Sequence, residues 1–148
     1  MPTSSIGKYI SILGRQAQKY LSDLVKQYGI GYASYFFVMY IGANPNCSQR
    51  EMCDAMSMDE AMATREMRKL LQSGYIIRER RPDDAKTYEI SLSDTGKVLY
   101  RELKEKLIGW WGDLAKESNV DADKLAEQLK NMSEVAAKKL EELKTEGK

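Results

Sequence analysis

The residues of this chain best suited to binding chemistry are basic side chains gathered near its middle. Residues 61–82 carry two acids and six bases, the bases being Arg65, Arg68, Lys69, Arg78, Arg80 and Arg81. Clustered guanidinium and ammonium groups attract polyanions, and a guanidinium can also bond guanine in the major groove of DNA. The whole chain has 23 bases against 22 acids, so the positive charge is local. The positive charge is therefore concentrated where a polyanion could meet it.

The chain lacks the residue types that common catalytic and metal sites need. The 148 residues contain no His and two Cys, which excludes imidazole catalysis and leaves too few ligands for a zinc site. No glycine-rich phosphate loop follows a strand-like segment, and no nucleophile elbow is present. We therefore expect no enzyme activity, no cofactor and no metal.

Signals for the membrane or for export are also missing from the sequence. No apolar run approaches the roughly 20 residues of a membrane-spanning helix, and the N-terminus has no signal-peptide pattern. Two cysteines offer at most one disulfide, which is a thin framework for a secreted protein. We expect a cytoplasmic protein that does not associate with membranes.

Two short helices are expected to position the first group of bases. Residues 48–51, Ser-Gln-Arg-Glu, have the form of a capping box that opens a helix. Met52, Ala55 and Met56 would then face inward. A second helix, at residues 59–72, should follow closely and end at a Ser-Gly pair. Two such helices joined by a tight turn form a helix-turn-helix.

After the second of these helices, the hydrophobic pattern changes from helical to alternating. Residues 75–80 and 87–92 predict two strands joined by a turn at 82–86. A helix-turn-helix followed directly by a hairpin is a winged helix. We assign this lobe to residues 32–92, with a buried, apolar helix at 32–41 as its first element.

Amphipathic helices flank the winged lobe on both sides. Residues 6–28 carry an apolar stripe, and a long helix capped by Ser93 or Asp94 precedes a final helix with a stripe of its own. We predict a mainly α fold with a small β hairpin, in one domain over residues 1–148. The outer stripes exceed what one small lobe can cover, which favours a homodimer. The remaining parts of the domain are dimerisation helices at 1–30 and 113–148 and a connecting long helix at 93–117.

The helix at residues 59–72 is the candidate recognition helix. Its core side would carry Ala63, Met67, Leu70 and Leu71. Its outward side would carry small side chains followed by bases, namely Ala61, Met62, Thr64, Arg65, Arg68 and Lys69. Small side chains allow close approach to a major groove, Thr64 can meet a thymine methyl or a phosphate, and Arg65 can bond guanine or phosphate. An ordinary solvated helix face has the same pattern, and the basic hairpin beside it favours DNA.

The predicted hairpin carries bases that suit a DNA backbone. Arg78 and Arg80 fall on one strand face, with Arg81 and Lys86 at the tip. Bases on a protruding hairpin can reach phosphates or enter a minor groove. Asp84 precedes Lys86 by two residues and could hold it by a short-range salt bridge. The alternative is a protein-interaction module whose basic hairpin binds an acidic partner.

Five segments in a fixed order carry a family resemblance. They are Ser-Gln-Arg-Glu-Met at 48–52, Thr-Arg at 64–65, Leu-Leu-Gln-Ser-Gly-Tyr-Ile-Ile-Arg at 70–78, Asp-Ala-Lys at 84–86 and Leu-Ser-Asp-Thr-Gly at 92–96. Together they resemble the MarR family of winged-helix transcription regulators. Two features depart from the family pattern: Lys86 stands where Arg is usual, and the candidate recognition helix begins Glu-Ala-Met instead of with Ser or Thr. The operator preference of a relative therefore cannot be transferred.

The resemblance implies a homodimer whose two recognition helices enter successive major grooves of a pseudo-palindromic double-stranded DNA operator. With the residue patterns above, it gives as DNA contacts Ser48, Gln49, Ala61, Met62, Thr64, Arg65, Arg68, Arg80, Arg81, Asp84 and Lys86. It further implies a repressor released by a small aromatic or phenolic effector. Tyr32, Tyr35 and Phe36 are candidate walls of the effector pocket, although the core of the buried helix is the simpler explanation for these rings.

Cys47 and Cys53 leave another mode of regulation open. The resemblance implies that some relatives sense oxidants through a cysteine, usually in the first helix, where this chain has none. Cys47 directly precedes a predicted helix N-terminus, whose dipole favours a thiolate. A thiol-based redox-sensing regulator is therefore an alternative to two passive thiols.

Overall fold

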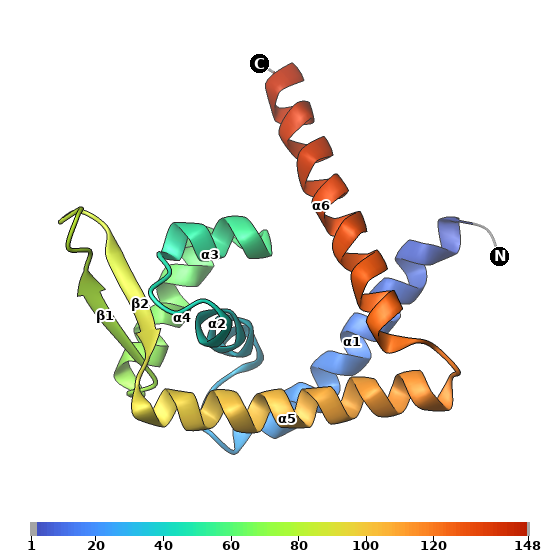
Figure 1. Cartoon of the computed structure of the whole chain (residues 1–148), viewed down its shortest axis with the longest axis horizontal. Helices are drawn as coiled ribbons and strands as arrows, with labels where there is room; N and C mark the ends of the chain where they lie inside the picture. Colours follow the sequence, from blue (N-terminus) through green and yellow to red (C-terminus); the bar gives the residue numbers. More distant parts are fainter. Residues whose placement is uncertain (1–2, 148) are drawn as a thin grey trace. The chain divides into compact units, whose positions relative to one another are not determined.

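The computed structural model describes residues 3–147 of the chain. Their helices and strands follow in the order α1 (Ser4–Lys26), α2 (Tyr32–Ala43), α3 (Gln49–Met56), α4 (Glu60–Gln72), β1 (Ile76–Arg80), β2 (Tyr88–Leu92), α5 (Asp94–Glu117) and α6 (Ala122–Glu146) (Figure 1). The chain forms two compact units, Met1–Leu103 and Lys104–Lys148, and α5 runs from the first into the second. The predicted mainly α fold with a small β hairpin is confirmed.

Local capping explains where α3 and α4 begin. The Ser48 hydroxyl accepts a hydrogen bond from the Glu51 amide at 3.1 Å, and the Glu51 carboxylate accepts one from the Ser48 amide at 3.0 Å. This reciprocal pair is the predicted capping box. The Asp59 carboxylate accepts hydrogen bonds from two amides in the first turn of α4. Between the helices, Ser57 takes a left-handed φ of 52° that ends α3, so the helix-turn-helix is confirmed.

The hairpin is attached to the helix-turn-helix through the main chain. β1 and β2 pair antiparallel, with Ile76 opposite Leu92. The Ile90 amide donates to the Cys47 carbonyl at 2.7 Å, which bridges the other edge of β2 to the segment that enters α3. The predicted winged helix is therefore confirmed, and β2 of its wing is bonded to the segment before α3 at Ile90.

The core of the first unit gathers around α2, which contacts α1, α3, α4 and β2. Phe37, Val38 and Ile41 are fully buried, as predicted for this helix. The other elements contribute the fully buried side chains Met52, Leu70, Leu99 and Leu103. The inward position predicted for Ala55 is wrong, because the buried side of the short helix α3 also includes Cys53, and this rotation turns Ala55 to solvent.

Gly96 allows the first turn of α5 to lie against the start of the hairpin. A Cβ atom at this position would lie 2.0 Å from the Tyr75 carbonyl oxygen, which is closer than real Cβ contacts. That carbonyl accepts a hydrogen bond from the Ser93 amide at 3.0 Å. The Ser93 hydroxyl in turn accepts one from the Gly96 amide at 3.0 Å, so Ser93 is the residue that caps α5. This junction fixes the position of β1 and β2 from the C-terminal side.

The first and last helices leave apolar side chains exposed. The buried side chains of α1 are Ala17, Leu21 and Val25, and its exposed apolar ones are Ile6, Tyr9, Ile10 and Leu13. Every side chain between residues 122 and 146 is exposed, including Leu125, Leu129, Met132, Val135, Leu140 and Leu143. None of the helices described is long and apolar enough to cross a membrane. Dimerisation through residues 1–30 and 113–148 stays a prediction, and the exposed stripes are consistent with it.

Candidate nucleic-acid interface

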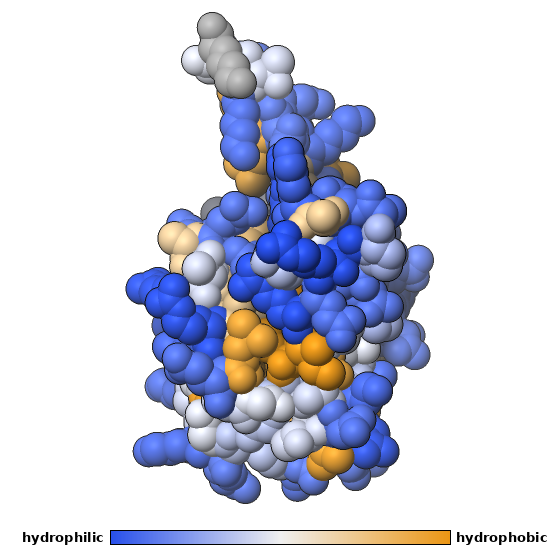
Figure 2. All heavy atoms as spheres, turned by 90° about the vertical axis from the view of Figure 1, so that its left-hand side faces the viewer, coloured by the Kyte–Doolittle hydropathy of each residue, from blue (hydrophilic) through white to orange (hydrophobic). Residues whose placement is uncertain are grey.

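α4 separates a buried side from an exposed side, as the sequence predicted. Its buried side includes Ala63, Met67 and Leu70, with Leu71 half-buried. Its exposed residues include Ala61, Thr64, Arg65, Arg68 and Lys69, with Met62 half-buried. Seen from the side of the hairpin, hydrophilic side chains surround a smaller hydrophobic patch (Figure 2). The helix therefore presents small residues and then bases to solvent, which suits close approach followed by contact with an anion.

A side-chain hydrogen bond joins the start of α3 to the exposed side of α4. The Gln49 amide nitrogen donates to the Thr64 hydroxyl at 3.0 Å. Thr64 in turn donates to the Glu60 carbonyl, one turn back, at 2.9 Å. These contacts place two of the predicted DNA contacts side by side and restrict the rotamers of both.

Ser48 has a structural role in addition to the DNA contact that was predicted for it. Its hydroxyl is part of the capping box, and the residue is buried. Because the hydroxyl is already bonded to the Glu51 amide, Ser48 first of all orients α3. A direct contact between this side chain and DNA stays a prediction.

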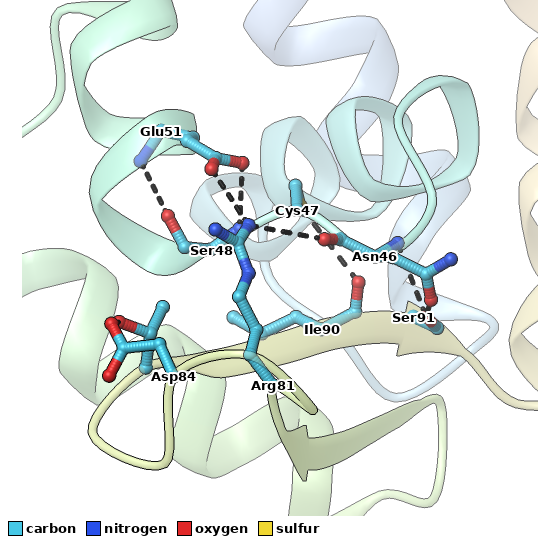
Figure 3. A network of polar contacts seen from close by, with 9 residues as sticks. Asn46, Cys47, Ser48, Glu51, Arg81, Asp84, Ile90 and Ser91 are labelled. Atoms are coloured by element: carbon cyan, nitrogen blue, oxygen red, sulfur yellow. Dashed lines mark hydrogen bonds and ion pairs between the residues drawn. The ribbon is translucent and has the colours of Figure 1, made fainter.

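Arg81 points to α3, and its predicted place at the hairpin tip is wrong. Its guanidinium donates to the Glu51 carboxylate at 2.7 Å and makes a long contact of 3.5 Å with the Asn46 carbonyl (Figure 3). The bond from Arg81 and the bond from the Ser48 amide lower the pKa of the Glu51 carboxyl. Glu51 thus caps α3 and binds the wing at the same time, and it neutralises one base of the wing.

Arg78 and Arg80 lie on the same face of β1, as predicted. Both guanidinium groups stack on the ring of Tyr88, with their carbon atoms 4.0 Å and 5.1 Å from its centroid. Arg80 also donates to the Ala85 carbonyl across the turn. Tyr88 was missed in the sequence, although it lies directly opposite Arg80 in the hairpin register. The ring orders two cations on one side of the wing.

Asp84 orders the turn of the wing through the main chain. Its carboxylate accepts hydrogen bonds from the Thr87 hydroxyl at 2.7 Å and from the Lys86 amide at 3.0 Å, and these bonds lower its pKa. The predicted salt bridge to the Lys86 ammonium is therefore wrong, because the acid is used by the backbone of the turn. Within residues 3–147 the Lys86 ammonium has no ion-pair partner, and the side chain is exposed.

Side chains of α3 and the wing face one hollow in the surface. Its lining includes Gln49, Arg50, Glu51, Arg78, Lys86 and Tyr88. The structure thus brings Gln49 of α3 and two bases of the hairpin around one concave surface. Acids, Glu51 among them, line the same hollow, so its positive charge comes from the bases alone.

The two thiols are buried and free. Burial, with a smaller contribution from the nearby Glu51 carboxylate, raises the pKa of Cys47 to about 11. Burial also raises the pKa of Cys53. The expectation that a helix dipole favours a Cys47 thiolate is therefore wrong, because desolvation outweighs it. In the described part of the chain, no group of three or more acidic or cysteine side chains could hold a metal ion.

Tyr32, Tyr35 and Phe36 form one aromatic cluster at the start of α2. Tyr32 and Phe36 have ring centroids 5.0 Å apart, as do Tyr35 and Phe36, in edge-to-face arrangements. Tyr35 is buried, which raises the pKa of its hydroxyl, whereas the other two rings are half-buried. Core packing accounts for these contacts, and a role in binding an effector stays a prediction.

A capped helix-turn-helix, an exposed basic helix face and a hairpin with ordered cations define a winged-helix protein. Comparison with known proteins gives the family: the chain belongs to the MarR family, whose model matches residues 32–88. A MarR transcriptional regulator from Methanosarcina mazei Go1 has a solved structure that is 30% identical, with a TM-score of 0.81 over 92% of this chain and 99% of that one.

A curated relative agrees with this assignment, and a further solved structure shares the fold. The HTH-type transcriptional regulator BilQ of Clostridioides difficile (strain CD3) is 27% identical over 126 residues, which cover 84% of this chain and 85% of the relative. A MarR-family regulator from Listeria monocytogenes, solved with a 26-mer DNA, is 19% identical, with a TM-score of 0.82 over 90% of each chain. The similarity to the Listeria monocytogenes structure shows a shared fold alone.

Proposed function

We propose that this chain is a sequence-specific regulator of transcription that binds double-stranded DNA as a homodimer. One observation carries the proposal: α4 exposes small residues and bases along one side, while its other side is packed into the core. Such a helix can enter a major groove without disturbing the fold. The named functions of the relatives, which are transcriptional regulators, support the same conclusion.

The proposed DNA contacts form two groups, one that suits the major groove and one that suits phosphates. Arg65 carries a guanidinium on the exposed side of α4, which suits a bidentate bond to guanine or a bond to phosphate. Ala61 and Met62 permit close approach, and Gln49 and Thr64, already bonded to each other, face the same side as a pair. In the wing, Lys86 and the two stacked guanidinium groups suit phosphates.

Dimerisation, repression and effector release complete the proposal. The exposed apolar side chains of α1 and α6 would be covered by a second copy, which gives two recognition helices to match a pseudo-palindromic operator. A small aromatic or phenolic effector would act by stabilising a spacing of the two lobes that no longer fits the duplex. We place the protein in the cytoplasm, where DNA is available and the two thiols stay reduced.

Selection of random duplexes by the purified protein tests the proposal. We expect enrichment of a two-fold-symmetric site with half-sites about one helical turn apart, and binding that weakens steeply as salt rises. Enrichment of an asymmetric site would contradict the dimer. No enrichment, with weak binding equal for all sequences, would contradict specific DNA binding and favour an acidic protein partner of the basic wing.

A further inference from the structure

One acid interrupts the pattern of the helix α4. Glu66 follows the exposed Arg65, yet it is 6% exposed and lies among the buried positions of the helix. A buried carboxylate is tolerated only where cations or hydrogen-bond donors satisfy it, and an apolar side chain would pack there at lower cost. The presence of the acid therefore calls for an explanation beyond packing.

Two groups on opposite sides satisfy the Glu66 carboxylate. The Ser34 hydroxyl of α2 donates to one oxygen at 2.5 Å, and Ser34 itself is only 1% exposed. The Lys69 ammonium lies 3.2 Å from the other oxygen, and its side chain is 67% exposed. Ser34 belongs to the first turn of α2, where a negative charge interacts favourably with the helix dipole. Glu66 thus connects the core to the exposed side of α4.

We propose that Glu66 is a positioning residue that fixes the rotation of α4 against α2 and restrains Lys69 on the DNA-facing side. The hydrophobic effect itself is non-directional, whereas a buried hydrogen bond requires a defined distance and angle between its two groups. Because Arg65 directly precedes Glu66 on the helix, the bond between Ser34 and Glu66 sets the direction in which the Arg65 guanidinium leaves α4. The inference rests on the proposed DNA binding.

The restraint on Lys69 has a separate consequence. An ammonium paired with Glu66 contributes less to nonspecific attraction than a free one, because its charge is partly neutralised. Lys69 lies one turn after Arg65 and would otherwise meet the same backbone phosphates regardless of sequence. The pair therefore lowers affinity for random DNA while the orientation of Arg65 preserves affinity for the operator. Glu66 acts on specificity through two neighbours without touching DNA.

The first test removes the link to the core. In Ser34→Ala, we expect the dissociation constant for the selected operator to rise about tenfold, the effect of one mismatched base pair, while that for a random duplex changes less than about twofold. Val38→Ala is the matched control, because it also removes buried atoms from α2 and leaves the link intact. Both variants are measured where circular dichroism shows them folded. An equal loss of specificity in both variants would overturn the proposal.

The second test releases Lys69. Glu66→Gln keeps the size of the side chain and removes its charge, so we expect tighter binding to random DNA and a salt dependence steeper by up to about 0.9 in log–log slope per chain. Glu79→Gln is the control, since it removes the same charge from an exposed position of β1. If the two variants change the slope equally, Glu66 does not restrain Lys69.

Amide hydrogen exchange in the free protein tests whether Glu66 positions α4, independently of DNA binding. We expect Ser34→Ala to accelerate exchange in α4 more than in the hairpin, and Val38→Ala to leave the ratio between these two regions unchanged. The same ratio in both variants would overturn the positioning role. If the wild-type protein selects no duplex, the proposed function fails, whereas the exchange experiment still decides whether Glu66 orients α4.

Discussion

The two bases near the hairpin turn are expected to respond differently to salt. Lys86 has an exposed ammonium, whereas the Arg81 guanidinium lies 2.7 Å from the Glu51 carboxylate, so that pair carries no net charge. A base that neutralises a phosphate contributes about 0.9 to the log–log slope of affinity against salt. We therefore expect Lys86→Gln to flatten the slope by about 0.9 per chain, and the double variant Arg81→Gln/Glu51→Gln to leave it unchanged.

Fluorescence anisotropy with a labelled operator provides the assay. Between 50 and 200 mM salt, the ratio of wild-type to Lys86→Gln affinity should shrink by about 3.5-fold per chain, while the ratio for the double variant should stay constant. The double variant keeps the capping box, because Gln can replace Glu at the third helical position. If the double variant flattens the slope as much as Lys86→Gln does, then Arg81 leaves Glu51 to bind phosphate, and the assignment of this pair is refuted.

Four other predictions follow from single sites. Arg65→Ala should weaken operator binding by about 1–3 kcal/mol and random duplex binding much less, measured by the same assay; equal losses would make Arg65 a phosphate contact. Gly96→Ala should lower the free energy of unfolding by about 1–3 kcal/mol in urea titrations, because the new methyl meets the Tyr75 carbonyl; an unchanged midpoint would contradict the close approach. Since the pKa of Cys47 is raised to about 11, the thiol should react with a disulfide reagent far more slowly at pH 8 in the native protein than after unfolding; comparable rates would restore the redox-sensing alternative. The lowered pKa of Glu51 stabilises the fold above the ordinary pKa of a glutamate, and that contribution is lost as pH falls through the folded value. Glu51→Gln should thus reduce the loss of stability between pH 6 and pH 3, and an identical pH profile would contradict this reasoning.

The parts of the fold that depend on neighbours in sequence could be predicted. The capping box at Ser48 and the end of α4 need only residues within a few positions of each other. The exposed side of α4 was also predictable, because helical periodicity places Arg65 and Arg68 opposite the apolar positions. The position of the hairpin could be predicted from the alternating hydrophobic pattern of its two strands.

Contacts between distant segments account for the errors at the site. Arg81 was placed at the tip because its carboxylate partner is 30 positions away in the sequence. The effect of the helix dipole on Cys47 was a local argument, and it was outweighed by burial under β2. Glu66 was counted as an ordinary acid of the basic segment, since nothing near it in sequence indicates Ser34, 32 positions away. Tyr88 could have been found by aligning the two strands across the turn.

The hydrogen bond from the Ile90 amide to the Cys47 carbonyl bears on how this lobe can change during evolution. Because the contact involves main-chain atoms alone, it does not depend on which exposed side chains the hairpin carries; proline at position 90, which lacks the amide proton, would remove it. The bases of the hairpin can therefore be exchanged while the frame that carries them persists. A lobe built in this way can acquire a new target sequence by surface substitutions, with little risk to its own folding.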